Sequence, residues 1–364
     1  MITRRKALAV GTGAVALGVG GYWILNGGPS YDDAVQSTWV KQTAKANADF
    51  DYLVHHATLA ANSHNTQPWL FSKMAERVTI QPDLSRSTPI VDPDGHHLFA
   101  SLGCAAENLL LAANAAGKGA ALAFDANGDG RIEIDLAGNA VRDPLFDAIV
   151  DRQCTRSDYD GKPISNEDLD ALLKAAKVEG CELIMIPEKN RIEQALELVI
   201  AANTAQVEDP AFTAELKSWL RFSAAKAIAT GDGLYATCSG NPTMPQWLGN
   251  IVFSFVFKPR SENDRYAKQI RSSSGLAVFV TDKDNKQHWV QAGRSYQRFA
   301  LKAASLGIRN AFINQPVEVA SMRPEFAKLM GIEGRRPDLI VRFGHAPTMP
   351  KSLRRPTKDV IVQV

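Results

Sequence analysis

The feature that most constrains the fold is an apolar helical pattern that occurs twice. Residues 103–117 read GCAAENLLLAANAAG, and residues 293–307 read GRSYQRFALKAASLG. Both segments begin and end in glycine, and Leu111 and Leu301 occupy equivalent places at an offset of 190. A short strand-like run follows each segment. The repetition predicts an internal duplication, in which two related halves meet near residue 150.

The rest of the chain alternates helical and strand patterns. Amphipathic spacing predicts helices over about 35–61, 166–179, 189–206 and 212–229. Short apolar runs predict strands over 78–81, 120–124, 131–136, 182–186, 275–281, 311–313 and 338–344. Strands this short and this widely separated favour an α+β fold, with helices that cover antiparallel or mixed sheets.

The first thirty residues are typical of a targeting segment. The pair Arg4-Arg5 precedes an apolar run over 7–25, which ends at the breaker Asn26-Gly27-Gly28-Pro29. This arrangement resembles a twin-arginine export signal, although Ala7 stands where an aromatic residue is usual. The run could span a bilayer and has no clean cleavage site, so a cleaved signal and an uncleaved membrane tether both remain open. The resemblance implies export of the folded chain by the twin-arginine machinery, to the periplasm or to a membrane anchor facing it.

Charge and metal-ligand patterns indicate which classes of partner and ligand the chain is not expected to bind. The net charge of +2 offers no polybasic field, so we expect no nucleic-acid partner. The pairs His55-His56 and His96-His97 lack a recognised metal-ligand spacing, so we expect no metal site. Residues 125–130 (DANGDG) resemble the start of a calcium loop, but Leu136 stands where the bidentate glutamate is needed. A hairpin turn between the strands at 120–124 and 131–136 is the better interpretation.

The most specific string is NSHNTQPW, residues 62–69. Asn65 and Gln67 are carboxamides two positions apart, and each offers both a donor and an acceptor. Such a pair could match the polar edge of a flat heterocycle. The alternative is a capped turn with no ligand.

A second string, RQCTR at 152–156, places two arginines four residues apart. The guanidinium groups of Arg152 and Arg156 could converge on one phosphate, because each can pair with two anionic oxygens. An ordinary solvated charge pair is the alternative.

These two strings resemble the flavin-binding signatures of the nitroreductase family, in the form found in Acg-type proteins. The resemblance implies a nitroreductase-like fold in which two fused halves form a pseudo-dimer within one chain and hold FMN between them. Asn65 and Gln67 would then meet the isoalloxazine edge, with Ser63 and His64 supporting the turn. Arg152 and Arg156 would hold the phosphate or the O2 edge of the ring. Cys154 stands where the family has serine or threonine, which weakens one hydrogen bond to the phosphate.

Two further segments resemble the same family. Arg354-Arg355-Pro356 follows a predicted terminal strand, and the resemblance implies that Arg354 or Arg355 reaches the phosphate. A basic tail is the alternative. Asn314-Gln315-Pro316 resembles a Thr-Gln-Pro string of the family, which implies that its amides approach the ring from the second half. A turn before the helix near Pro324 is the other interpretation.

The segment 231–259 is rich in glycine, proline and aromatic residues. Such segments are often lids or binding loops. A packed connection that buries Phe253, Phe255 and Phe257 is an equal alternative. The predicted organisation is therefore a signal or anchor at 1–30, a first half at 31–150, and a second half at 151–364 that includes this possible lid.

The resemblance implies an FMN-dependent oxidoreductase that passes electrons from a small-molecule donor to a small-molecule acceptor. No side chain need be catalytic, because the flavin carries the chemistry and the protein supplies binding and electrostatics. The alternative is an FMN-storing protein whose lid shields the flavin from NAD(P)H.

Overall fold

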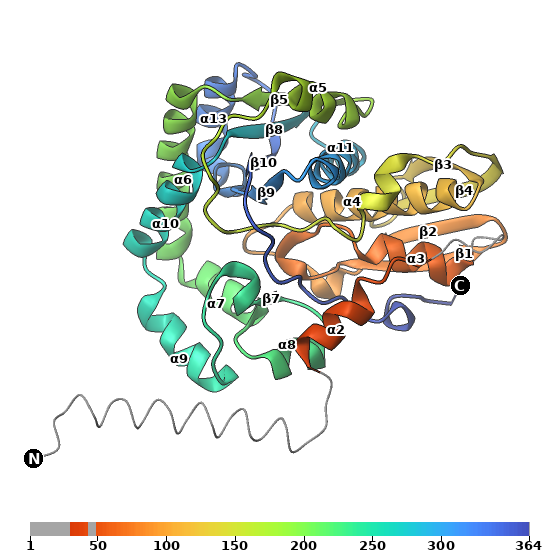
Figure 1. Ribbon diagram of the computed structural model, residues 1–364, viewed down its shortest axis with the longest axis horizontal. Coiled ribbons are helices and arrows are strands. Elements are labelled where there is room, and N and C mark those ends of the chain that lie inside the picture. The colour runs from red at the N-terminus through yellow and green to blue at the C-terminus, as the bar shows by residue number, and fades with distance from the viewer. Residues whose placement is uncertain (1–29, 43–48, 364) are drawn as a thin grey trace, which may run out of the picture.

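A computed structural model of the chain describes residues 30–42 and 49–363. The predicted export signal and membrane tether fall on residues 1–29 and lie outside the described residues. The described part is an α+β fold, as predicted, with two four-stranded antiparallel sheets and helices packed against them (Figure 1).

The strands of the first half form one sheet and those of the second half another. The first sheet has the order β1(Trp69–Met74)-β2(Arg77–Pro82)-β4(Arg131–Asn139)-β3(Lys118–Asp125). The second has the order β5(Cys181–Ile186)-β8(Gly275–Thr281)-β10(Pro337–Gly344)-β9(Arg309–Phe312). A short parallel pair joins β6(Leu220–Arg221) to β7(Leu234–Tyr235).

The α-helices are α2(Tyr31–Thr38), α3(Phe50–Thr58), α4(His96–Ala115), α5(Asn166–Ala175), α6(Lys189–Glu208), α7(Pro210–Trp219), α8(Ala224–Thr230), α9(Gln246–Val256), α10(Pro259–Arg271), α11(Lys286–Ser305), α12(Gln315–Glu318) and α13(Arg323–Met330). By length and composition α4 could cross a membrane, but 89% of its apolar window is buried inside the protein, as in the core helix of a globular fold.

The predicted strands are all present within a few residues; β1 and the short strands β6 and β7 were not predicted. The predicted helix at 212–229 is divided. The chain leaves α7 through the short strand β6, and Ser223 then starts α8 by accepting a hydrogen bond from the Lys226 backbone N–H. The 125–130 segment is the predicted hairpin turn, with Gly128 and Gly130 at positive φ between the paired strands β3 and β4.

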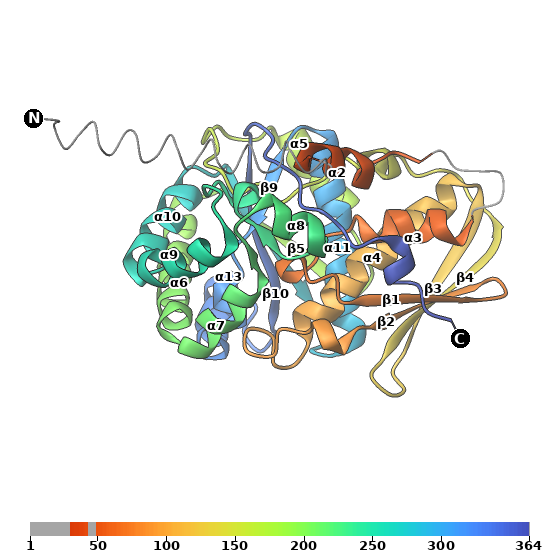
Figure 2. The same ribbon diagram turned by 90° about the horizontal axis from the view of Figure 1, so that it is seen from below.

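The two repeated segments are the central helices α4 and α11, which cross between the sheets (Figures 1 and 2). A Cβ placed on Gly103 would lie 2.1 Å from the Val290 carbonyl oxygen, and one on Gly293 would lie 1.9 Å from the Ala100 carbonyl oxygen. The two contacts are reciprocal, since each joins a repeat glycine to the residue that precedes its counterpart by three. This is the geometry of a two-fold interface within one chain. Glycine is required at both places because the helix backbones touch.

The last residues of the chain return to the first half (Figure 1). The Phe71 N–H on β1 donates to the Val360 carbonyl at 2.7 Å, and the Val362 N–H donates to the Phe71 carbonyl at 2.8 Å. One apolar core cluster also joins both halves across α4 and α11. The sheets therefore respect a boundary near residue 150, but the core and the C-terminal segment cross it.

Candidate functional site

A cavity of about 350 Å³ lies between the halves. The first half contributes residues 61–64 and one face of α4. The second half contributes Arg156, parts of α6, α10 and α11, and the residues around α12. The segment that joins α7 to α10 closes a further side. This volume lies in the range of pockets that bury a small molecule or a cofactor.

The SHNTQ turn has an unusual backbone. His64, Asn65 and Gln67 have φ values of 48°, 54° and 55°, in the left-handed region that side chains other than glycine seldom adopt. The Gln67 N–H donates to Asn62 Oδ1 at 2.9 Å, which closes the turn. Strain of this kind costs on the order of 1–3 kcal/mol for each residue and collects at functional sites. The turn presents Ser63 and His64 to the cavity.

The side-chain amides of Asn65 and Gln67 face other parts of the chain. Asn65 Nδ2 donates to the Gly233 carbonyl at 3.0 Å, and Gln67 Nε2 donates to the Gly231 carbonyl at 2.9 Å. Their oxygens accept from Arg354 and from the Arg355 backbone N–H. Neither residue lines the cavity. In this arrangement the two carboxamides tie the turn to the 231–233 segment and to the C-terminal segment; a contact with a heterocycle remains a prediction.

Arg156 is the arginine of the RQCTR string that lines the cavity. Its guanidinium makes no ion pair or hydrogen bond with any side chain or backbone group that the structure describes. His64 lies close by, and burial together with the charge of Arg156 lowers the pKa of His64 to about 4. The cavity wall therefore carries a neutral imidazole beside an unneutralised cation.

A second group of cations gathers around the Trp39 ring. Arg152, Lys351 and Arg354 lie 6.0, 4.7 and 5.0 Å from its centroid. None of the three forms an ion pair with an acidic side chain in the described ranges, and Arg152 Nε is buried without a partner. Burial, followed by the charge of Arg152, lowers the pKa of Arg354 to about 9. The three residues do not line the cavity.

Cys154 and Arg355 also lie outside the cavity lining. Cys154 forms an isolated bridge to Asn310 beside β9. Arg355 lies 3.5 Å from Asp83 and donates to the Asp359 carbonyl. Neither contact resembles a ligand site, so any role of these two residues toward a phosphate stays a prediction.

Asn314 and Gln315 line the cavity from the second half, at the start of α12. Asn314 Oδ1 accepts from the Ile340 N–H at 2.8 Å, and its Nδ2 lies 3.0 Å from His97 Nε2. Gln315 Oε1 is buried and has no hydrogen-bond partner among the described residues. An orphaned buried acceptor on a cavity wall indicates a site for a donor from a ligand.

The 231–259 segment supplies much of the remaining wall, from Leu234 to Phe257. Phe253 and Phe257 stack at 4.6 Å beside the cavity. Phe255 is 74% exposed, so the alternative of a connection that buries all three phenylalanines is wrong for that residue. The segment covers a ligand-sized space, as a lid would; its movement remains a prediction.

Sequence reasoning missed the α4 and α11 side chains that face the cavity. His97, Ser101 and Cys104 line it from successive turns of α4, and Tyr296 lines it from α11. Glu318 on α12 completes this side. The spacing 97–101–104 is a helical face and was visible in the sequence, but no pattern showed that this face borders a cavity and not the core.

Asp92, His96 and His97 form a buried cluster whose potential ligand atoms lie within 4.8 Å of one another. Most of these atoms are already engaged. The Asp92 oxygens accept the backbone N–H groups of His97 and Leu98 at 2.9 Å. His96 Nε2 lies 2.9 Å from Asp338 Oδ1. The cluster is thus held by hydrogen bonds at the start of α4 and has few lone pairs to offer a cation.

Comparison with known proteins gives a consistent result for the second half. The profile described as "Nitroreductase family" matches residues 149–345, just over half of the chain. A protein of Mycobacterium tuberculosis strain H37Rv, named as a candidate NAD(P)H nitroreductase, is 23% identical over 322 residues, which cover 84% of this chain and 88% of the relative.

Solved structures with some likeness include two nitroreductases with bound FMN. The one from Desulfitobacterium hafniense is 20% identical and covers 62% of this chain and all of its own, with a TM-score of 0.40. The one from Bacteroides fragilis is 16% identical and covers 58% of this chain and 95% of its own, with a TM-score of 0.36.

Proposed function

Because the chain belongs to the nitroreductase family, we propose that it is an FMN-dependent oxidoreductase that passes electrons from a small-molecule donor to a small-molecule acceptor. The observation that carries the proposal is the cavity between the halves, where the unneutralised Arg156 and the orphaned oxygen of Gln315 face the same space. The finer assignment to the Acg-type group is part of the proposal. The fused halves and the covering segment support it.

The residues present fit FMN. Gln315 Oε1 can accept from a ring N–H, and Arg156 can neutralise an anionic oxygen. The cations at 152, 351 and 354 gather around Trp39, outside the cavity lining, and their contact with the phosphate stays a prediction. FMN held here would supply the redox chemistry, taking up a hydride and passing on its electrons. The chain would orient the ring, exclude water with the 234–257 wall, and stabilise negative charge that develops near Arg156.

The proposal is tested by the absorbance of the purified full chain. We expect flavin bands near ~450 and ~370 nm, and release of FMN on denaturation. Anaerobic NADPH should then bleach the bands of an enzyme that uses this donor. A colourless protein that does not take up added FMN would contradict the proposal.

The covering segment supports one alternative, an FMN-storing protein with a shielded flavin. Residues from Leu234 to Phe257 close one side of the cavity and could exclude a nicotinamide. Flavin that dithionite bleaches and NADPH does not would favour storage, or an enzyme with a different donor. Turnover with a quinone, driven by any small-molecule donor, would then decide between these two.

We further propose that the protein acts in the periplasm, after twin-arginine export, and faces a membrane through α9. Trp247, Ile251 and Phe255 form an exposed stripe on this helix at 66%, 50% and 74% exposure. At the start of the described chain the Tyr31 ring lies 4.3 Å from the ring of Tyr235 on β7, in the covering segment that also carries α9. An apolar run over 7–25 precedes that point. We propose that a bilayer that holds this run also meets the α9 stripe.

The membrane proposal predicts contact between Trp247 and lipid. The full chain would be reconstituted in vesicles whose acyl chains carry bromine, a short-range quencher of tryptophan. We expect Trp247→Phe to remove a clear part of the quenched emission, because the indole should lie at the apolar boundary of the bilayer. Trp219→Phe, whose ring contacts two arginines, is the matched control. Equal quenching in the native chain and the Trp247 variant would contradict the proposal.

A further inference from the structure

A line of hydrogen bonds runs from the cavity wall into the second sheet. At one end of the line, the donor and the acceptor can be assigned without ambiguity. The Ile340 backbone N–H can only donate, so Asn314 Oδ1 accepts from it at 2.8 Å. The other amide atom, Asn314 Nδ2, therefore faces His97 Nε2 at 3.0 Å. An amide NH₂ can only donate. In this arrangement His97 Nε2 must be an acceptor that carries no proton.

That assignment sets the tautomers of both histidines. With Nε2 bare, a neutral His97 carries its proton on Nδ1, which lies 3.3 Å from His96 Nδ1. Two protonated nitrogens cannot face each other at this distance, so His96 Nδ1 is the acceptor. His96 then carries its proton on Nε2 and donates it to Asp338 Oδ1 at 2.9 Å. One backbone N–H thus fixes the direction of three successive bonds.

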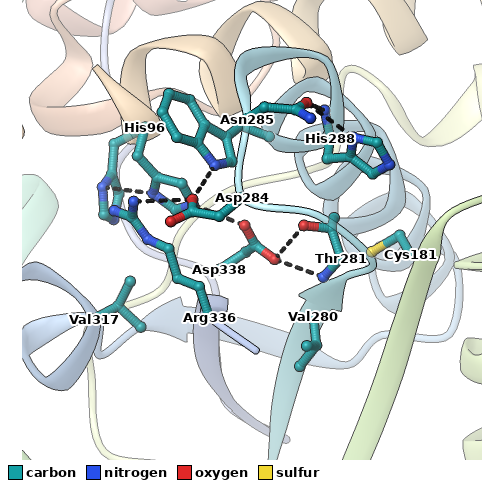
Figure 3. Close-up of polar contacts among 12 residues, drawn as sticks. His96, Cys181, Val280, Thr281, Asp284, Asn285, His288, Val317, Arg336 and Asp338 are labelled. Carbon is teal, nitrogen blue, oxygen red and sulfur yellow. Dashed lines mark hydrogen bonds and ion pairs between the residues drawn. The ribbon is translucent and has the colours of Figure 1, made fainter. Parts of the chain in front are cut away.

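Asp338 ends the line inside the second sheet. It is 0% exposed, and its Oδ2 accepts from the Thr281 N–H at 2.7 Å and faces Thr281 Oγ1 at 2.9 Å. Figure 3 shows the carboxylate between Thr281 and His96. Burial raises the pKa of Asp338 to about 7 in spite of these bonds. The carboxyl group can therefore hold or release a proton near neutral pH.

The opposite end of the line opens on the cavity. His97 and Glu318 both line it, and Glu318 Oε1 lies 3.8 Å from His97 Nε2. Gln206 Nε2 donates to Glu318 Oε2 at 2.7 Å. Burial raises the pKa of Glu318, and the charge of His97 opposes this rise. Glu318 is thus a second acceptor for a proton that leaves His97.

We propose that Asp338, His96, His97 and Glu318 form a proton relay that supplies a proton to an acceptor reduced in the cavity. The line has two states that differ by one proton. In the loaded state Asp338 donates to His96 Nε2, His96 Nδ1–H donates to His97 Nδ1, and His97 Nε2–H faces Glu318. The Asn314 NH₂ group cannot accept, so it must move away from His97 Nε2 in this state. Release of the Nε2 proton, reversal of the two bonds between Asp338 and His97, and return of the Asn314 NH₂ group give the arrangement that the structure holds.

The use of this proton rests on the proposed oxidoreductase function. A quinone becomes a hydroquinone by taking two electrons and two protons. A hydride supplies both electrons and one proton, and the relay supplies the second. Ferricyanide takes one electron and no proton, so its reduction has no use for the relay. The two acceptors therefore separate proton supply from electron supply.

Several charged groups face the relay. Asp92 Oδ1 lies 3.5 Å from His97 Nδ1, and its charge helps to raise the pKa of His97 against the lowering effect of burial. Arg336 lies on the Asp338 side, where it pairs with Asp94 and Asp284. His64 is a further titratable neighbour on the cavity side, and Cys181 is one on the Asp338 side. Burial, with His97 and Arg336, holds the pKa of His96 well below its usual range, so His96 passes a proton on and does not store it.

The first test reads the tautomers in the full chain labelled with ¹⁵N-histidine, by the nitrogen shifts of each imidazole. We expect His97 protonated at Nδ1 and His96 at Nε2. In Asp338→Asn, the oxygen still accepts from Thr281, so the NH₂ group faces His96 Nε2. His96 should then move its proton to Nδ1. Asp284→Asn removes a nearby charge outside the line and should leave both tautomers unchanged.

The second test compares acceptors in the flavin-loaded protein. We expect Asp338→Asn to slow quinone reduction about 10-fold or more, as for loss of a proton donor, and to leave ferricyanide reduction unchanged. Asn314→Asp is a second variant. Its added carboxylate oxygen should accept from His97 and hold the proton on Nε2.

A native His96 protonated at Nδ1 would overturn the proposal, as would equal slowing of both acceptors in Asp338→Asn. The tautomer test needs no flavin, so it also separates the relay from the proposed function. Correct tautomers in a chain that does not bind FMN would leave the hydrogen-bonded line in place and remove only the oxidoreductase role.

Discussion

Replacing Arg156 with alanine is expected to weaken FMN binding by roughly 10- to 150-fold. Hydrogen bonds to charged groups contribute about 1.5–3 kcal/mol, and each 1.4 kcal/mol corresponds to about a tenfold change in Kd. Arg156 lines the cavity, and its guanidinium has no partner in the described ranges, so its removal leaves no internal group unpaired. The loss should therefore appear in ligand affinity and not in folding. Titration of the flavin-free chain with FMN, followed by fluorescence, measures it.

Riboflavin shows which part of FMN Arg156 contacts. If Arg156 holds the phosphate, the variant should weaken FMN binding and leave riboflavin binding unchanged. If it contacts the ring edge, both ligands should weaken together. Arg77→Ala removes an exposed arginine that pairs with Glu133 and Asp135 on the first sheet, and it serves as the charge control. Unchanged FMN affinity in Arg156→Ala would remove Arg156 from the site.

Replacing Gly293 with alanine is expected to lower the free energy of unfolding by about 2–3 kcal/mol, as for overpacking of a tight core. Helix propensity alone would give the opposite sign, since alanine is favoured over glycine in a helix by about 1 kcal/mol. The new Cβ would lie 1.9 Å from the Ala100 carbonyl oxygen, so α4 and α11 must separate. Denaturant unfolding of the variant and the native chain measures the difference.

The reciprocal variant tests whether the crossing is truly two-fold. Gly103→Ala should cost a similar free energy, because its Cβ would meet the Val290 carbonyl oxygen at 2.1 Å. The double variant should cost less than the sum of the two, since helices already separated by one methyl group accommodate the second more easily. A stabilised Gly293→Ala would show that the crossing is looser than these distances.

Elements with a regular pattern of apolar residues were predicted well from the sequence. The strand at 275–281 was predicted with its exact bounds because seven consecutive buried residues of a central strand give an unbroken apolar run. The central helices were visible as a repeat. By contrast, β1 reads WLFSKM, with two polar or charged positions in its second half, and it directly follows the SHNTQP turn. Local pattern alone did not separate it from that turn.

The site was only partly predictable, for a physical reason. Ser63, His64, Arg156, Asn314 and Gln315 were predicted as site residues, and all line the cavity. The predicted ligand contacts of Asn65 and Gln67 compete with hydrogen bonds that their side-chain amides form to other parts of the chain. Those partners, at 231–233 and 353–355, lie far away in the sequence. No periodicity encodes such contacts. Glu318 and Asp338 were likewise invisible, because only the fold brings them to His97 and His96.

The crossing of α4 and α11 has a consequence for how this chain can vary. In a homodimer every substitution at a two-fold interface appears twice. An acidic residue introduced there therefore appears at both symmetry-related positions, and both must accommodate it. Here Glu107 on α4 pairs with Arg294 and Arg298 on α11, while the positions equivalent to these three are Gln297, Cys104 and Asn108. The two segments are identical at the terminal glycines and at two further pairs, Leu111/Leu301 and Ala113/Ala303. Because this chain holds both helices, each helix can change alone, and one side of the crossing can specialise while the other keeps the structure.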